Sequence, residues 1–213
     1  MRLLAKKLSA AGFDTLRFDY YGTGDSGGET TAAELSGWKD DIVAAAHELK
    51  EMSDTQRVVL VGVRLGGTLV AEVAPRLGEN IDGIVLWDPI VHGASYLRGM
   101  RNERGYDDSV SEPSAFKEKG ASAVLEMEGV PVSQAFVSDL QAIDLCSKEL
   151  RLPARRLIVF TDRPATPCKL LDDNLASEAD ILMMNAALPW SVAPAGEEAF
   201  PIEICDRIIE WLR

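Results

Sequence analysis

Short apolar runs alternate along the chain with segments whose apolar residues recur at helical spacing. The run Val58–Val63 is rich in β-branched residues and has no charged position, which is typical of a strand buried on both faces of a parallel sheet. Similar runs predict strands at 15–19, 84–87, 157–160 and 181–184. Helical spacing predicts helices over 2–11, from 35 to 49 behind a Thr31-x-x-Glu34 capping box, near 65–74, and from 201 onward. Strands joined by crossover helices predict a doubly wound α/β domain with a mainly parallel sheet of about five strands.

The alternation stops between Gly93 and Leu152. Residues 105–122 are polar and rich in loop formers, and residues 133–145 are weakly helical. We therefore expect residues 1–92 and 153–213 to form the α/β core and residues 93–152 to form an inserted cap. Such sheets bind ligands at the carboxyl ends of their strands, where we expect the cap to sit.

Composition narrows the classes of partner. Acidic residues outnumber basic ones by 34 to 22 and the net charge is −12, which disfavours nucleic acid and anionic membrane surfaces. No apolar run approaches the about 20 residues of a membrane span, and two lysines near the start interrupt any signal-peptide core. The three cysteines, Cys146, Cys168 and Cys205, have no metal-like spacing. We expect a reduced, cytoplasmic protein with packed thiols and with neither metal nor cofactor.

One string imitates a known catalytic sequence. Gly24-Asp25-Ser26-Gly27-Gly28 matches the surroundings of the nucleophile in trypsin-like proteases, and His47 follows three alanines much as their histidine does. Those enzymes are all-β, and their histidine precedes the serine in the chain. In this chain the serine precedes the histidine, and the predicted strands alternate with helices. We therefore interpret the string as a strand-to-helix loop and His47 as a solvent-exposed helix residue.

A second motif lies where a buried strand turns sharply into a helix. Gly62-Val63-Arg64-Leu65-Gly66-Gly67 occupies the context of the nucleophile elbow G-x-S-x-G, with Arg64 at the position that projects from the top of the sheet. An unpaired, partly buried charge there would cost roughly 3–5 kcal/mol, so we expect a carboxylate to hold Arg64. Asp88, at the end of the next strand, is the first candidate, with capping of the turn before Pro89 as its alternative role. Asp162 is the second candidate.

These motifs resemble the α/β-hydrolase fold, in its broad serine aminopeptidase-like and lipase-like group. The sequence from Phe18 to Ser26 resembles that fold's Asp-x-x-Gly-x-Gly-x-Ser strand and loop. The Arg-Leu-Gly elbow, Trp87-Asp88-Pro89, and His92-Gly93 followed by Tyr96-Leu97 are similar to hydrolase-like proteins associated with exosortase systems. The resemblance covers most of residues 1–100 and, more loosely, residues 154–213. It implies hydrolysis of carboxylic esters or peptide bonds.

The chain departs from the catalytic pattern that this resemblance implies. The nucleophile position holds Arg64, whose guanidinium stays protonated and cannot attack a carbonyl. The family's histidine should follow the last strand, at about 186–199, yet the only histidines are His47 and His92. We also expect the oxyanion-hole loop to be absent, because the sequence begins at the helix that follows it. Asp162 is a candidate remnant of the triad acid, or a structural residue that caps a helix or pairs with Arg163.

Three functional hypotheses stay open. The first is a degenerate α/β-hydrolase that binds a small anionic or acyl ligand at the strand ends, through Arg64, Leu65, Asp88 and His92. The second is an active esterase or peptidase in which His92 assists a displaced nucleophile, Ser26 or Ser95. The third is a non-enzymatic module that binds a protein partner.

The resemblance also bears on the strand predicted at 15–19. In the family's sheet another strand, which precedes the opening helix, lies between it and 58–63. Without that strand, either the two pair directly or a slot with two unpaired edges remains. Buried unpaired backbone groups cost about 1–3 kcal/mol each, so we expect direct pairing. A persistent slot would predict an unstable chain, or an oligomer formed through the unpaired edge.

Overall fold

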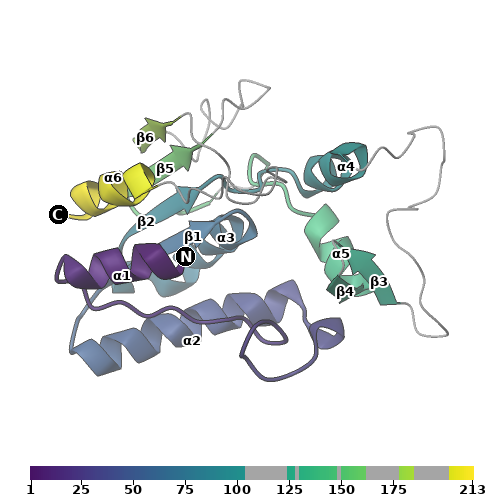
Figure 1. Cartoon of the computed structure of the whole chain (residues 1–213), viewed down its shortest axis with the longest axis horizontal. Coiled ribbons are helices and arrows are strands. Elements are labelled where there is room, and N and C mark those ends of the chain that lie inside the picture. The colour runs from purple at the N-terminus through teal and green to yellow at the C-terminus, as the bar shows by residue number, and fades with distance from the viewer. Residues whose placement is uncertain (104–123, 128–129, 148–149, 162–177, 185–201) are drawn as a thin grey trace.

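A parallel β-sheet forms the centre of the molecule. The computed structural model describes residues 1–103, 124–127, 130–147, 150–161, 178–184 and 202–213. Within these residues the sheet has four strands in the order β1-β2-β5-β6, and all its pairs are parallel. The strands are β1 (Val58–Val63), β2 (Ile81–Trp87), β5 (Arg156–Phe160) and β6 (Asp180–Met183). The predicted doubly wound α/β architecture is confirmed (Figure 1).

Helices cover both faces of this sheet. They are α1 (Arg2–Ala10), α2 (Leu35–Ser53), α3 (Leu65–Leu77) and α6 (Ile202–Leu212), with a short 3-10 helix, η2 (Gly78–Asn80), after α3. Alternate residues of the strands belong to different apolar clusters. Val85 and Trp87 of β2 pack with α1 and α6, whereas Ile84 and Leu86 pack with α2 and α3. The period-2 alternation of a strand thus builds two cores, one on each side of the sheet.

The segment after β2 leaves the sheet and returns to the same place. It contains α4 (Gly93–Glu103), an antiparallel pair β3 (Val124–Met127) and β4 (Val130–Ser133), and α5 (Gln134–Gln141). The amide of Gly93 donates to the carbonyl of Ile143 at 2.9 Å, and Leu145 donates to Val91 at 2.9 Å. Phe136 and Leu140 of α5 belong to the same apolar cluster as α2 and α3. Helix α5 is therefore packed into the core rather than built around a core of its own.

The predicted capping box is wrong. Residues Thr30–Ala32 form a 3-10 helix, η1, and α2 begins at Leu35 with Glu34 at its N-cap and no side-chain cap. The hydroxyl of Thr30 instead donates to the carbonyl of Gly22 at 2.6 Å. This contact ties η1 to the glycine-rich loop.

The predicted strand at 15–19, and with it the direct pairing to β1, is also wrong. Residues 13–20 form neither helix nor strand, and among the described residues β2 is the only strand that pairs with β1. Both ends of this segment are held elsewhere: the amide of Phe13 donates to Leu8 of α1 at 3.1 Å, and Tyr20 stacks on Trp38 of α2 at 4.8 Å between ring centroids. The segment between these two contacts runs beside β1 without pairing with it.

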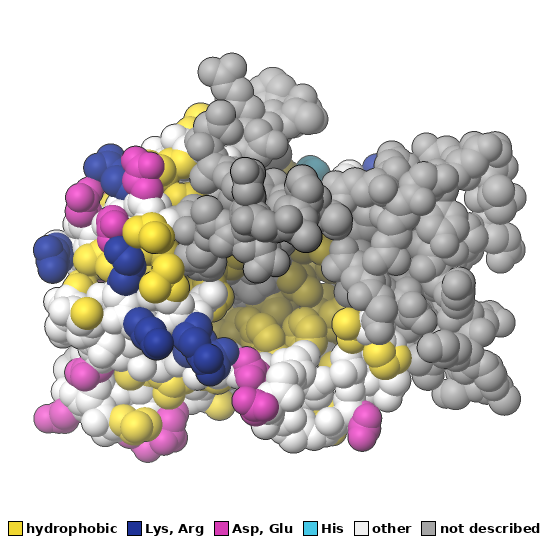
Figure 2. Space-filling model, viewed as in Figure 1, with side chains coloured by type: hydrophobic (Ala, Val, Ile, Leu, Met, Phe, Trp, Pro, Cys, Tyr) yellow, Lys and Arg dark blue, Asp and Glu magenta, His cyan; other side chains and the backbone are white. Residues whose placement is uncertain are grey.

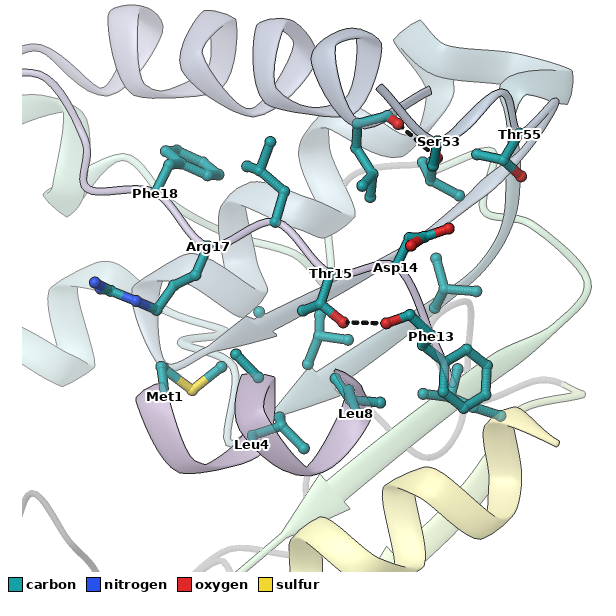
Figure 3. Close-up of a pocket in the computed structure, with 18 of the residues that line it drawn as sticks. Met1, Leu4, Leu8, Phe13, Asp14, Thr15, Arg17, Phe18, Ser53 and Thr55 are labelled. Atoms are coloured by element: carbon teal, nitrogen blue, oxygen red, sulfur yellow. Dashed lines mark hydrogen bonds between the residues drawn. The ribbon is translucent and has the colours of Figure 1, made fainter. Parts of the chain in front are cut away.

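A cavity of about 850 Å³ lies between β1 and residues 12–20 (Figure 3). Its lining includes Leu4 and Leu8 of α1 and the valines of β1. The amide of Arg64 donates to Trp87 of β2 at 2.8 Å. Since strand amides alternate in direction, those of Val59, Val61 and Val63 point away from β2, toward the cavity. Four of the six β1 residues are accordingly only half-buried, whereas every residue of β5 is buried. The expectation that Val58–Val63 is fully buried is therefore wrong.

Candidate functional site

The elbow between β1 and α3 places Arg64 at the carboxyl end of the sheet. Arg64 has φ 54° and ψ −124°, a backbone conformation that residues other than glycine rarely adopt. A Cβ on Gly62 would lie 2.4 Å from the carbonyl oxygen of Gly66, so the strand and the helix approach too closely for any other residue at position 62. The glycines of the motif thus create the sharp turn, and the turn presents Arg64.

The half-buried guanidinium of Arg64 faces the first helix of the inserted segment. Its Cζ lies 5.2 Å from the centroid of the Tyr96 ring, which is a cation–π distance. The amide of Tyr96 donates to the carbonyl of His92 at 3.0 Å, a bond of the first turn of α4, so the ring lies at the start of this helix. The elbow and the start of α4 therefore form one side-chain environment.

Asp88 makes hydrogen bonds to the residue that follows β5. Its carboxylate accepts hydrogen bonds from the amide of Thr161, at 3.0 Å, and from the Thr161 hydroxyl. Its own amide donates to Val159 at 2.8 Å. Among the described residues no ion pair joins Asp88 to Arg64, and Asp162 lies outside them. Asp88 thus joins the ends of β2 and β5.

His92 contacts an aspartate at the far end of the inserted segment. Its Nδ1 lies 3.3 Å from Oδ1 of Asp144, and the same oxygen accepts from the amides of Cys146 at 3.0 Å and Ser147 at 3.1 Å. Burial would raise the pKa of Asp144, but these amides and the neighbouring His92 outweigh it and lower that pKa. The Asp144 carboxylate is therefore ionised at neutral pH, and it lies beside the His92 ring.

The two serines considered as displaced nucleophiles lie in separate settings. The hydroxyl of Ser95 accepts a hydrogen bond from Arg98 at 3.2 Å. Ser26 lies in the glycine-rich loop, where its amide donates to Thr23 at 3.0 Å. Within the part of the chain that the structure describes, neither hydroxyl is hydrogen-bonded to His92. The structure does not bring the expected serine–histidine pair together.

The glycine-rich loop is folded onto itself. The Asp19 carboxylate accepts from the amide of Asp25 at 3.2 Å, and Gly22 donates to Gly27 at 2.9 Å. A Cβ on Gly24 would lie 2.4 Å from the Asp19 carboxylate, so the motif's second glycine makes room for that carboxylate. The contacts agree with the interpretation of this string as a structural loop. His47 is exposed on α2, as predicted.

Sequence reasoning missed Tyr20 as a residue of this site. A Cβ on Gly66 would lie 3.6 Å from the Tyr20 hydroxyl, so this hydroxyl is next to the elbow. Burial, reinforced by Asp41, raises the pKa of Tyr20 to about 12. Aromatic contacts continue from Tyr20 to Trp38 at 4.8 Å and from Trp38 to Phe136 of α5 at 5.0 Å. The available signal was the position of Tyr20 directly after Asp19 in the loop motif.

The surface near these elements is apolar in part. Figure 2 shows hydrophobic side chains gathered in a hollow on the face toward the viewer, between the side with α1 and α6 and the side with β4 and α5.

None of the helices described is both long enough and apolar enough to cross a membrane.

Comparison with known proteins agrees with this geometry. Residues 1–111 match the family described as "Serine aminopeptidase, S33". An uncharacterised 31.7 kDa protein of Escherichia coli, from the traX-finO intergenic region, is 30% identical over 125 residues, which are 58% of this chain and 43% of that protein. The chain thus spans less than half the length of this curated relative.

Solved structures of α/β hydrolases share the fold. Est1E from Butyrivibrio proteoclasticus, with ferulic acid bound, has a TM-score of 0.66 at 18% identity, over 98% of this chain and 80% of that one. An esterase of Pyrococcus furiosus has a TM-score of 0.64 at 18% identity, over 100% of this chain and 74% of that one. A monoacylglycerol lipase of Paleococcus ferrophilus has a TM-score of 0.63 at 19% identity, over 99% of this chain and 87% of that one. With its elbow, its parallel sheet and this family match, the chain belongs to the serine aminopeptidase S33 family of α/β hydrolases.

Proposed function

We propose that this chain binds a small carboxylate-bearing or acyl ligand at the elbow and does not carry out acyl transfer through a serine triad. The observation that carries the proposal is Arg64 at the elbow position, with φ 54° and ψ −124°. Removing a triad nucleophile costs a factor on the order of 10⁶ in rate, and a guanidinium cannot replace it. The residue that the elbow presents at the carboxyl end of the sheet is therefore a cation.

The chemistry around Arg64 favours an anion. A guanidinium presents several N–H donors in a planar fork that matches a carboxylate. Arg64 also precedes the first turn of α3, whose unpaired amides and dipole favour negative charge. The Tyr96 ring, 5.2 Å from the guanidinium, offers an aromatic surface beside it. Ferulic acid, bound in the similar Est1E structure, combines a carboxylate with an aromatic ring and is a suitable probe.

Calorimetric titration of the protein with ferulate and with butyrate tests the proposal. We expect Arg64→Ala to weaken ferulate binding at least tenfold, about 1.4 kcal/mol, because the cation is lost. Arg207→Ala is the matched control, since Arg207 is exposed on α6 and pairs with Glu210 at 2.9 Å. Wild-type protein that binds neither carboxylate, or an Arg64→Ala variant that binds as well as wild type, would overturn the proposal.

One observation favours the alternative of an active enzyme. The Nδ1 of His92 lies 3.3 Å from the Asp144 carboxylate, which is the arrangement of a general base oriented by an acid. A fluorophosphonate probe separates the two hypotheses. Labelling that is lost in Ser95→Ala or Ser26→Ala would establish a displaced nucleophile, whereas absence of labelling agrees with the binding role.

A further inference from the structure

Three side chains with different metal-binding atoms meet where the inserted segment leaves and rejoins the core. The donor atoms of His92, Asp144 and Cys146 all lie within 4.8 Å of one another. The geometry points to a binding site for a divalent transition-metal ion, Zn²⁺ foremost, at these three residues. This inference is independent of ligand binding at Arg64.

The spacing of two of the donors already suits such an ion. Zinc lies about 2.0–2.2 Å from nitrogen and oxygen ligands in tetrahedral geometry, which separates two such ligands by about 3.4 Å. The distance from His92 Nδ1 to Asp144 Oδ1 is 3.3 Å. A thiolate bound at about 2.3 Å would lie about 3.6 Å from each of them. The Cys146 sulfur lies within 4.8 Å of both atoms, so it is at most about 1.2 Å farther from them than this spacing.

The backbone holds the two halves of the cluster together. An antiparallel bridge pairs His92 with Asp144, and hydrogen bonds of 2.9 Å flank it on both sides, from Gly93 to Ile143 and from Leu145 to Val91. The amides of Cys146 and Ser147 orient the Asp144 carboxylate at 3.0 and 3.1 Å. Such bonds to a ligand fix its direction and support metal affinity.

The set of donors selects the metal. One imidazole, one thiolate and one carboxylate suit Zn²⁺, whereas Ca²⁺ and Mg²⁺ prefer oxygen ligands alone. The thiolate and the carboxylate together balance the charge of the ion, and the thiol proton passes to solvent on binding. His92 is exposed and Asp144 and Cys146 are half-buried, so the ion has a path to the site and a water can complete its coordination.

The alternative is an ordinary His92–Asp144 contact with Cys146 merely nearby. Titration of the metal-stripped full chain with ZnCl₂, and separately with CoCl₂, distinguishes the two. We expect one Zn²⁺ per chain and, with Co²⁺, a near-ultraviolet charge-transfer band that reports a thiolate ligand. Cys146→Ser should abolish the band, and both Cys146→Ser and His92→Gln should weaken Zn²⁺ binding at least tenfold.

Controls separate loss of the site from loss of the fold. His47→Gln changes an exposed histidine on α2 and should bind Zn²⁺ as wild type does. Circular dichroism checks that each variant is folded, and Zn²⁺ should raise the melting temperature of wild type and His47→Gln but not of Cys146→Ser or His92→Gln. If Cys146→Ser does not fold, Cys146→Ala takes its place. Failure of wild type to bind, binding that survives either ligand substitution, or a cobalt spectrum without the thiolate band would each overturn the inference.

Discussion

Replacing Arg64 by glycine tests whether the elbow is strained. A residue with a side chain at φ 54° and ψ −124° stores about 1–3 kcal/mol of backbone strain, which glycine does not. The matched comparison is Arg64→Gly against Arg64→Ala, because both variants lose the contact with Tyr96 and only alanine keeps a Cβ.

The sign of the expected difference is unusual. Glycine normally destabilises a folded protein by about 0.5–1 kcal/mol relative to alanine, because it loses more backbone freedom on folding. At position 64 the relieved strain of about 2 kcal/mol exceeds that loss. We therefore expect Arg64→Gly to be about 1 kcal/mol more stable than Arg64→Ala, or about 2–4 °C higher in melting temperature for a chain of this size.

Urea unfolding followed by circular dichroism measures this difference from the midpoints at a common m-value. Ala44→Gly is the control, since Ala44 is exposed within α2 and glycine there should cost about 1 kcal/mol. An Arg64→Gly variant less stable than Arg64→Ala, with a loss like that at position 44, would show that the elbow carries no strain.

Three other measurements check the structure at separate places. Gly93→Ala should destabilise the protein by several kcal/mol in urea unfolding, of order 3 or more, because its Cβ would lie 1.6 Å from the backbone carbonyl oxygen of Leu140; Gly27→Ala, with no atom within 4 Å of the added carbon, should change stability by less than about 0.5 kcal/mol. Ultraviolet titration should show a tyrosine that ionises with a pKa of about 12, and this phase should be absent from Tyr20→Phe. Because folding raises the pKa of Tyr20 from 10.0, its protonation contributes to the free energy of unfolding below pH 10, and this contribution is lost as the pH rises toward 12. Hydrogen exchange followed by NMR should find the outward amides of β1, those of Val59, Val61 and Val63, far less protected than the amides that face β2. Equal protection of the two sets would contradict the open edge.

Periodicity along the chain was sufficient to predict most of the fold. Strands β1, β2, β5 and β6 and helices α1, α2, α3 and α6 all lie where apolar spacing places them. Most of them bury the face that the pattern marks, whereas β6 leaves Ile181 and Met183 exposed. The strand at 15–19 failed for a reason that its own sequence does not contain. Strand formation depends on pairing with a neighbour, and this segment lies across a cavity from β1, with Tyr20 stacked on Trp38 of α2.

The site could be predicted only where its residues are neighbours in the sequence. The glycine pattern around Arg64 is contiguous, and the elbow it predicts is present. The expected partner Asp88 does lie at the end of the neighbouring strand, but it is bonded to Thr161, which follows β5 and comes much later in the sequence. The cluster of His92, Asp144 and Cys146 was missed because a backbone bridge between His92 and Asp144, which are far apart in the sequence, brings it together.

Among the described residues, strand β1 has an unpaired outer edge and also leads into the elbow. We therefore ask whether the contacts that fix the elbow depend on that edge. The hydrogen bonds that fix the turn are made with β2 and the residues after it, on the opposite side of β1 from the cavity. Arg64 donates through its amide to Trp87 of β2 at 2.8 Å, and the buried hydroxyl of Thr68, one turn into α3, donates to Ile90 at 2.7 Å. Gly62 is in tight backbone contact with α3. All of these contacts involve β2, the residues that follow it, or α3, and none crosses the cavity. The direction of Arg64 is therefore set independently of whatever lies along the outer edge of β1, so a change at that edge should alter the stability of the strand before it alters the geometry of the site.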